Sequence, residues 1–341
     1  MENNEVTTKP KRKINRKVIL DFMKLHKFEL AAYLGFVLCL IVFSILPPII
    51  NGVSIWDKVP FKNFMKKITP LLIVGIGATF IYSMGAIDIS VGYQTAVYGA
   101  IFVVILNSTG SIFLAFGTIV IIGILCAVFN ATIGAYVKLP AVMSSVILMQ
   151  LFSGISTLIQ DKFGGTSVDI TNPDTAARFT WTENQFLVIL VIIVLCVVAS
   201  YILKYTKIGK RARAIGANKL AANQAGAKLL ITRMSCYAVF SVFLCVCAFF
   251  LIGRSKSMPL AATENFQMDI MIMLLMGGVP LKGGMRVKLS GSIVGCITYN
   301  LISTGMSYCS VPPSLILITQ AVIFLVIVSM TCRTNEEYLP R

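Results

Sequence analysis

The chain has 341 residues, of which 57% are hydrophobic and 13% are charged, and its mean hydropathy is +0.84. Soluble domains carry about 25% charged residues, so this chain has too little polar surface to cover a water-soluble globule. The composition predicts one membrane domain. The net charge of +16 does not indicate nucleic-acid binding. The Lys and Arg residues gather in segments expected in the cytosol, where basic residues beside spans are retained, and no basic-aromatic module accompanies them.

The N-terminal tail, residues 1–27, is strongly basic. A signal peptide would have a short basic region and a small-residue cleavage site, whereas the first apolar run ends at Leu46-Pro47-Pro48 without such a site. We therefore expect a cytosolic tail over 1–27 and a retained first helix. A transmembrane domain over 28–332 and a cytosolic C-terminal tail over 333–341 complete the expected organisation.

Apolar runs along the chain predict the membrane spans. A span needs about 20 apolar residues, and about ten runs approach this length. They cover Phe28–Ile50, Thr69–Ala86, Val91–Asn107, Ser111–Val137, Pro140–Ile159, Gln185–Leu203, Met234–Gly253, Gln267–Val279, Leu289–Tyr308 and Ser314–Thr331. Backbone amides in lipid must be satisfied within each segment, which favours helices over strands. The predicted fold class is an all-α polytopic membrane protein with about ten transmembrane helices.

The distribution of charge predicts the orientation. An even number of spans puts both termini on one side, and the basic loop 204–233 then shares the cytosolic face with the N-terminal tail, as the positive-inside rule requires. Trp56 and Trp181 fall on the outer side, at the interface where indoles gather. One outer segment breaks the rule locally with Lys58, Lys62, Lys66 and Lys67.

Two segments do not read as simple spans. Gln267–Val279 is too short to span upright, and Asp88 interrupts a long apolar region. Irregular backbone at membrane depth is tolerated only inside protein or along a water-filled cavity, so both segments are candidate pathway elements. Asp88 and Asp269 are costly in apolar surroundings. Asp88 is interpreted as a cap for the helix that follows, with ion coupling as the alternative.

A short helix is expected within the cytosolic loop. Asn218 to Ala227 contains good helix formers and is ended by Gly226 as a C′ residue. The small side chains of Ala221 and Ala222 would let another surface approach closely. A solvated connecting helix without a partner is the equally weighted alternative, because Ala is simply a good helix former.

The sequence offers no catalytic or nucleotide-binding constellation. The Gly-rich loop that cradles phosphates is absent, and the single histidine, His26, lies in the basic tail, which excludes a Ser/His/Asp or Cys/His site. The nine cysteines are scattered without metal-ligand spacing. We expect neither enzymatic activity nor a cofactor or metal in this chain.

Several motifs carry a resemblance to a known family. Gly85 to Gly92 reads GAIDISVG, Gly209 to Asn218 reads GKRARAIGAN, and Met276 to Gly284 reads MGGVPLKGG. Asn130 and Leu139-Pro140 lie between the first two. In order and spacing these motifs resemble the permease subunits of ribose-type sugar ABC importers over about 70–330, most of the membrane domain.

The resemblance implies a ten-helix permease that dimerises around a translocation path. It also implies a separate ATPase that binds ATP and Mg²⁺, and an extracytoplasmic solute-binding protein, in a bacterial cytoplasmic membrane. It assigns contacts with the ATPase, in a coupling loop over 204–233, to Arg213, Asn218, Ala221, Ala222 and Gly226. It assigns path or signature positions to Asp88, Ser90, Gly92, Asn130, Asp269, Gly277, Gly278, Gly283 and Gly284.

Departures from the family pattern leave the solute open. Val279-Pro280 stands where Thr-Ser is usual, Arg286 replaces a Gly, and the stretch 141–147 lacks the expected Phe and Thr-Leu-Gly pattern. A pentose, a hexose, a related polyol and a furanosyl signalling compound are all compatible with the sequence, and the expected dimer partner is either a second copy or a related chain. An ion-gradient-driven secondary transporter that uses Asp88 or Asp269 is the alternative function, and a membrane enzyme is the less favoured third class.

Overall fold

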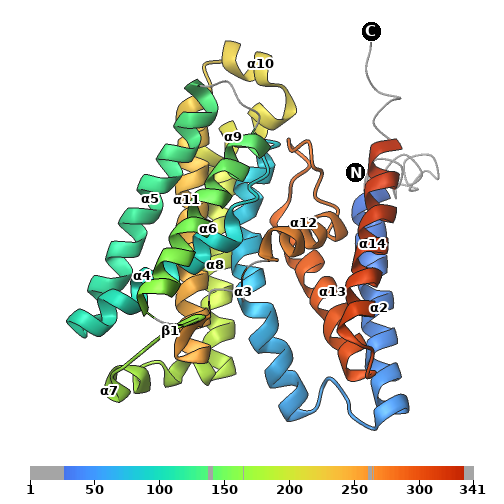
Figure 1. The fold of residues 1–341 in the computed structure, drawn as a ribbon. Coiled ribbons are helices and arrows are strands. Elements are labelled where there is room, and N and C mark those ends of the chain that lie inside the picture. The colour runs from blue at the N-terminus through green and yellow to red at the C-terminus, as the bar shows by residue number, and fades with distance from the viewer. Residues whose placement is uncertain (1–26, 137–140, 164, 260–262, 264, 334–341) are drawn as a thin grey trace, which may run out of the picture.

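The computed structural model describes residues 27–136, 141–163, 165–259, 263 and 265–333. Long helices dominate this part of the chain (Figure 1). They are α2 (Lys27–Asn51), α3 (Lys58–Ser83), α4 (Val91–Thr109), α5 (Ile112–Tyr136), α6 (Ala141–Phe163), α8 (Gln185–Tyr205), α11 (Leu229–Ser255), α12 (Phe266–Met276), α13 (Leu289–Tyr308) and α14 (Pro313–Arg333). Shorter elements are β1 (Ser167–Asp169), α7 (Pro173–Ala177), η1 (Thr180–Glu183), α9 (Lys207–Ala217), α10 (Lys219–Gln224) and β2 (Ser257–Pro259).

Each predicted apolar run coincides with one of the long helices or with α12, so the all-α polytopic fold is confirmed. Seven of these helices are long and apolar enough to cross a membrane by length and composition. The shorter apolar helices are α12 and the 313–326 part of α14, while α13 carries many polar residues. The number of crossings therefore stays a prediction, as do both tails, which lie outside the described residues apart from Lys27 and Arg333.

The second predicted run was placed too late in the chain. Helix α3 begins at Lys58 and ends at Ser83, whereas the apolar run predicts a span over 69–86. Hydropathy missed the first turns because they carry the outer lysines. The helix ends early because Gly85 adopts a left-handed φ of 69°, which glycine allows at little cost. The residues up to Ser90 are therefore an irregular connection.

Burial separates central helices from peripheral ones. The most apolar window of α3 is 83% buried, whereas that of α2 is 6% buried. In Figure 1, α3 stands between a group formed by α4, α5, α6, α8 and α11 and a second group formed by α2, α12, α13 and α14. Exposed large apolar side chains such as Leu34, Phe113 and Phe186 cover the outer helices. A surface of this kind suits lipid rather than water.

The two ends of the bundle carry different small elements (Figure 1). At one end β1 pairs antiparallel with β2, with Val168 opposite Met258. Phe179 and Trp181 stack there on Phe249 of α11, with ring centroids 5.4 and 6.0 Å apart. At the other end lie α9 and α10. The predicted outer segment and the predicted cytosolic loop thus occupy opposite ends.

Candidate functional site

The end of the bundle that holds α9 and α10 is built by local capping. Asn218 precedes α10, and its Oδ1 accepts hydrogen bonds from the backbone N–H groups of Leu220 and Ala221 at 3.0 and 3.1 Å. Gly226 follows the helix with a left-handed φ of 84°, the C′ conformation that the sequence predicted. Both residues therefore have structural reasons for their identity, because they fix where α10 begins and ends.

The five predicted ATPase-contact residues divide into exposed and internal positions. Asn218, Ala221 and Gly226 are exposed. Ala222 is buried against Ile215 and Ala227. The guanidinium of Arg213 donates to the carbonyl oxygen of Leu203 at 2.8 Å. Arg213 and Ala222 thus stabilise the segment from inside, and the face available to a partner runs through Ala221 and the neighbouring Leu220, which is 77% exposed.

Glycines join α9 to two other segments, backbone against backbone. A Cβ on Gly216 of α9 would overlap with the carbonyl oxygen of Ser83, at the end of α3, and would lie 2.5 Å from the amide nitrogen of Gly284. Gly284 N–H in turn donates to Ser83 O at 3.0 Å. A Cβ on Gly283 would lie 2.6 Å from Tyr82 O. The positive φ values of Gly283 and Gly284, 74° and 97°, allow this approach.

A second glycine contact joins α12 to α13. A Cβ on Gly277, which follows α12, would overlap with Gly291 O, and one on Gly295 would overlap with Met273 O. Gly291 and Gly295 form the small-xxx-small pattern of α13, which lets helix backbones approach closely. Gly278 adopts a φ of 75° and turns the chain away from α12. The predicted glycines therefore shape two close backbone junctions.

Asp88 lies in the irregular connection between α3 and α4 and is 6% exposed. Its Oδ1 accepts from Ser90 N–H at 2.9 Å and from Ser90 Oγ–H at 2.5 Å. Its Oδ2 accepts from Asn130 Nδ2 of α5 at 3.3 Å. The N-cap residue of α4 is Ser90. The prediction that Asp88 caps this helix was therefore wrong by two positions. Asp88 instead holds the turn that leads into α4.

The Asp88 network continues to two further helices. Asn130 Oδ1 accepts from Ser144 Oγ of α6 at 3.4 Å, and Arg233 Nη2 of α11 donates to Ser144 Oγ at 3.3 Å. The Arg233 guanidinium also lies over the Tyr237 ring, 5.6 Å from its centroid. A Cβ on Gly134 would overlap with this guanidinium. The network therefore ties four segments together around one buried carboxylate.

The segment that follows Asp88 contacts the segment that leads into Gln267, and neither of the two was predicted as a simple membrane span. A Cβ on Gly92, in the first turn of α4, would overlap with Thr263 O, which lies just before α12. Thr263 Oγ1 donates to Gly92 O at 2.8 Å. The beginning of α12 therefore rests against the beginning of α4. Irregular backbone of this kind inside a membrane protein is covered by protein or faces water.

Asp269 lies in the first turn of α12, where a carboxylate interacts favourably with the helix dipole. The Tyr299 hydroxyl of α13 donates to Asp269 Oδ1. One turn further along α13, Ser303 Oγ accepts from Lys67 Nζ of α3 at 2.7 Å. The hydrogen bonds around Asp269 share no residue with the Asp88 network, so the two predicted acids belong to separate clusters.

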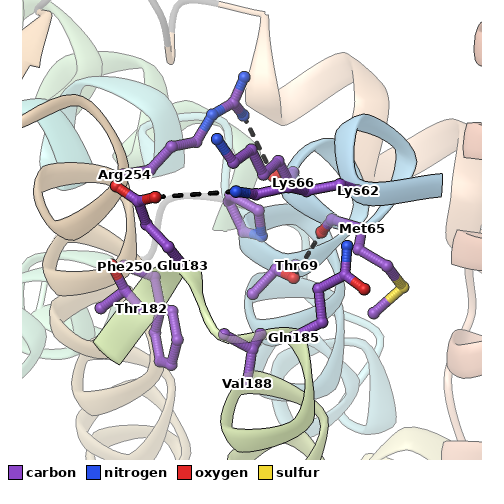
Figure 2. A pocket seen from close by; sticks show the side chains of 11 residues that line it. Lys62, Met65, Lys66, Thr69, Thr182, Glu183, Gln185, Val188, Phe250 and Arg254 are labelled. Atoms are coloured by element: carbon purple, nitrogen blue, oxygen red, sulfur yellow. Dashed lines mark hydrogen bonds and ion pairs between the residues drawn. The ribbon is translucent and has the colours of Figure 1, made fainter. Parts of the chain in front are cut away.

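A pocket at the opposite end from α10 lies between α3, α8, η1 and α11 (Figure 2). Its lining combines basic and apolar side chains, namely Lys62, Met65, Lys66, Thr69, Pro70, Thr182, Glu183, Gln185, Val188, Phe250 and Arg254. Lys62 Nζ pairs with Glu183 at 3.7 Å, and Arg254 donates to Lys66 O at 3.1 Å. Burial lowers the pKa of the neighbouring Lys256, while the charge of Glu183 acts to raise it and that of Lys66 to lower it. The side chain of Lys62, one of the unexpected outer lysines, therefore contacts η1, whereas α11 contacts α3 through the backbone carbonyl of Lys66.

Sequence reasoning missed several of these residues. Several hydrogen bonds of the two polar clusters are made by Arg233, Lys67 and Tyr299. Their roles follow only from which residues lie close together in the folded chain. Lys67 did carry a signal, because it broke the positive-inside rule. Leu139-Pro140, which contributed to the family resemblance, lies outside the described residues.

Comparisons with known proteins support this reading of the fold. A family described as the permease component of branched-chain amino acid transport systems matches residues 61–328. The chain is 24% identical to the ribose import permease of Haemophilus influenzae, covering 78% of this chain and 83% of the relative. It is 26% identical to the galactofuranose transporter permease of Escherichia coli, covering 84% and 85%.

A further relative is an autoinducer 2 import system permease of Salmonella paratyphi B, 26% identical over 67% of this chain and 64% of the relative. No solved structure is significantly similar to the chain. The resemblance to sugar ABC permeases is thereby confirmed, and the apolar helices fit a multi-pass protein of the bacterial inner membrane. The chain belongs to the family of permease components of branched-chain amino acid transport systems.

Proposed function

We propose that this chain is the membrane-spanning permease subunit of an ATP-driven ABC importer for a sugar or sugar-like small solute. Relatives named for the import of ribose, galactofuranose and autoinducer 2 support the solute class. The family name itself refers to amino acids, so the solute rests on these relatives rather than on the family. The chain forms the translocation path, while a separate ATPase binds ATP and Mg²⁺ and hydrolyses the ATP.

The observation that carries the proposal is the junction of Gly216, Ser83 and Gly284. Motion of α9 and α10, pressed by a partner, would pass directly to the end of α3, because bare backbone transmits displacement without a side chain that can rearrange. From there the connection to Asp88 leads into α4, and the loop at Gly284 leads from α12 into α13. A cytosolic partner is thereby linked to both irregular segments.

The proposal places α9 and α10 in a coupling loop over 204–233, within a permease domain over 28–332. The tails 1–27 and 333–341 would be cytosolic, as the basic N-terminal residues favour. The end that carries β1, α7 and η1 would then face an extracytoplasmic solute-binding protein. A second permease, either a copy or a related chain, would complete the path.

Transport driven by ATP distinguishes this proposal from a secondary transporter. The complex purified through a tag on this chain is reconstituted into proteoliposomes with radiolabelled D-ribose and D-galactose as probes. We expect accumulation that requires both ATP and the partner subunits. Accumulation by the purified chain alone, driven by a proton or sodium gradient, would contradict the proposal.

A further inference from the structure

An additional polar cluster lies where α3, α12 and α13 meet. Lys67 of α3 donates to Ser303 Oγ of α13 at 2.7 Å, and Tyr299 OH of α13 donates to Asp269 Oδ1 of α12. Gln320 of α14, which is 7% exposed, hydrogen-bonds to Tyr299 from the other side. Four elements thus contribute to one cluster, and the sequence had singled out Asp269 as a candidate site residue and Lys67 as a departure from the positive-inside rule.

The two charged groups of this cluster are held apart. Lys67 and Asp269 attract each other electrostatically, yet they do not form an ion pair within 4.0 Å. Each is held instead by a hydroxyl of α13, and these hydroxyl-bearing residues, Tyr299 and Ser303, are one helical turn apart. Four residues rise about 6 Å along a helix, so the residues that hold the two charges are separated by about that distance along α13.

The cluster is accessible from one side. Tyr299 and Ser303 are 4% and 6% exposed, whereas Lys67 is exposed in the isolated chain. Lys67 stands where the apolar run of α3 begins, and an ammonium group there is not stable against lipid hydrocarbon. This face must therefore meet water or another polypeptide. A face of that kind suits a water-filled path.

Two buried acceptors in the same part of α13 also lack partners. Asn300 Oδ1 and Thr304 Oγ1 have no hydrogen-bond partner among the described residues, although the two residues are 0% and 6% exposed. Buried polar atoms in native proteins are almost always paired with protein or with ordered water. These atoms therefore mark a place where water or a solute hydroxyl completes the hydrogen bonding.

From these observations we infer that Lys67 and Asp269 are the two ends of a contact site for a neutral, polyhydroxylated solute that passes between α3, α12 and α13. Lys67 donates to one solute hydroxyl, and the Asp269 carboxylate accepts from another. Tyr299 and Ser303 are positioning residues that hold the two charges apart. The opposite charges balance, so an anionic or cationic solute would always meet a like charge. This inference rests on the proposed function and adds its contact residues.

The test measures ATP-driven uptake by the reconstituted complex, with D-ribose and D-galactose as neutral probes and D-glucuronate and putrescine as charged probes. The variants are Lys67→Met, Asp269→Asn and Tyr299→Phe. Matched controls are Lys58→Met, at the exposed start of α3, and Tyr308→Phe, at the far end of α13. We expect the variants to lose uptake of the neutral probes at least about tenfold, while the two control variants keep wild-type uptake.

Failure of the contact site and failure of the proposed function give different results in this assay. Wild-type uptake that does not depend on ATP would overturn the proposed function itself. ATP-driven uptake that the three variants retain would overturn the contact site and leave the proposed function standing. Equal loss of uptake in Lys58→Met or Tyr308→Phe would show that the effect is not confined to the cluster and would also overturn the site. Preferential uptake of D-glucuronate or putrescine would overturn the assignment to a neutral solute.

Discussion

Gly216 of α9 lies against the carbonyl oxygen of Ser83 so closely that no side chain fits between them. Ser83 is the last residue of α3, the most deeply buried long helix, and its carbonyl also accepts from Gly284 N–H. One backbone oxygen thus joins the α9–α10 segment to the central helix and to the loop before α13.

Replacement Gly216→Ala should weaken the link between α9 and α3. The added Cβ must push either Ser83 or Gly284 away, and overpacking of this kind costs about 1–3 kcal/mol. We expect ATP-driven uptake to fall more steeply than ATPase activity. The measurement is the ratio of the two rates, which gives the solute transported per ATP hydrolysed. Gly117→Ala in α5 is the control, because nothing lies within 4 Å of a Cβ there. Unchanged transport per ATP in Gly216→Ala would contradict the link.

Replacement Gly92→Ala should separate the beginning of α4 from the segment before α12. Its Cβ would overlap with a backbone carbonyl, that of Thr263, which cannot rotate away as a side chain can. We expect a lower melting temperature and lower uptake than in the wild type. Gly154→Ala in α6, where a Cβ would meet nothing within 4 Å, should be tolerated. Equal melting temperatures for the two variants would argue against the contact.

Replacement Asp88→Asn should destabilise the turn into α4. Both carboxylate oxygens accept hydrogen bonds, from Ser90 and from Asn130, so an amide group would direct its own N–H toward a donor. An unmade buried hydrogen bond costs about 1–3 kcal/mol, to be read from unfolding in detergent by denaturant. Asp57→Asn, at an exposed position, should change stability by less than about 0.5 kcal/mol. Indistinguishable unfolding curves would contradict the network.

Replacement Asn218→Ala should loosen the start of α10. The Asn218 side chain accepts hydrogen bonds from the backbone N–H groups of Leu220 and Ala221. Loss of this N-cap costs about 1 kcal/mol. Amide hydrogen exchange over 219–222 should therefore quicken by about fivefold. Asn218→Asp should restore slow exchange because aspartate is an equally good cap. If exchange in Asn218→Ala stayed at the wild-type rate, capping would not control this helix.

Sequence reasoning predicted the fold well because hydropathy reports burial in lipid directly. Each predicted run lies on a helix, and the short run at Gln267 became α12. The boundaries of α3 were missed for the same physical reason, since its first turns hold lysines and its end is set by the left-handed Gly85 rather than by polarity. Hydropathy cannot see backbone conformation.

The candidate site was predicted only in part. Asp88 and Asp269 were found because an acid in an apolar run is costly, but the sequence could not show that they belong to separate clusters. The cluster around Asp88 draws residues from α5, α6 and α11, and the cluster around Asp269 draws them from α3, α13 and α14. Arg213 and Ala222 were predicted as contacts for a partner, and only the folded chain shows how each supports the loop from inside.

Docking of α10 on a partner that hydrolyses ATP is tested by substitution of Ala221. Ala221 is exposed, whereas Ala222 is buried, so Ala221→Arg alters the docking face without disturbing the fold. We expect Ala221→Arg to abolish ATP-driven uptake while the melting temperature of the purified chain is kept, and Ala221→Ser to transport normally. Undiminished uptake in Ala221→Arg would contradict the docking of α10 on such a partner.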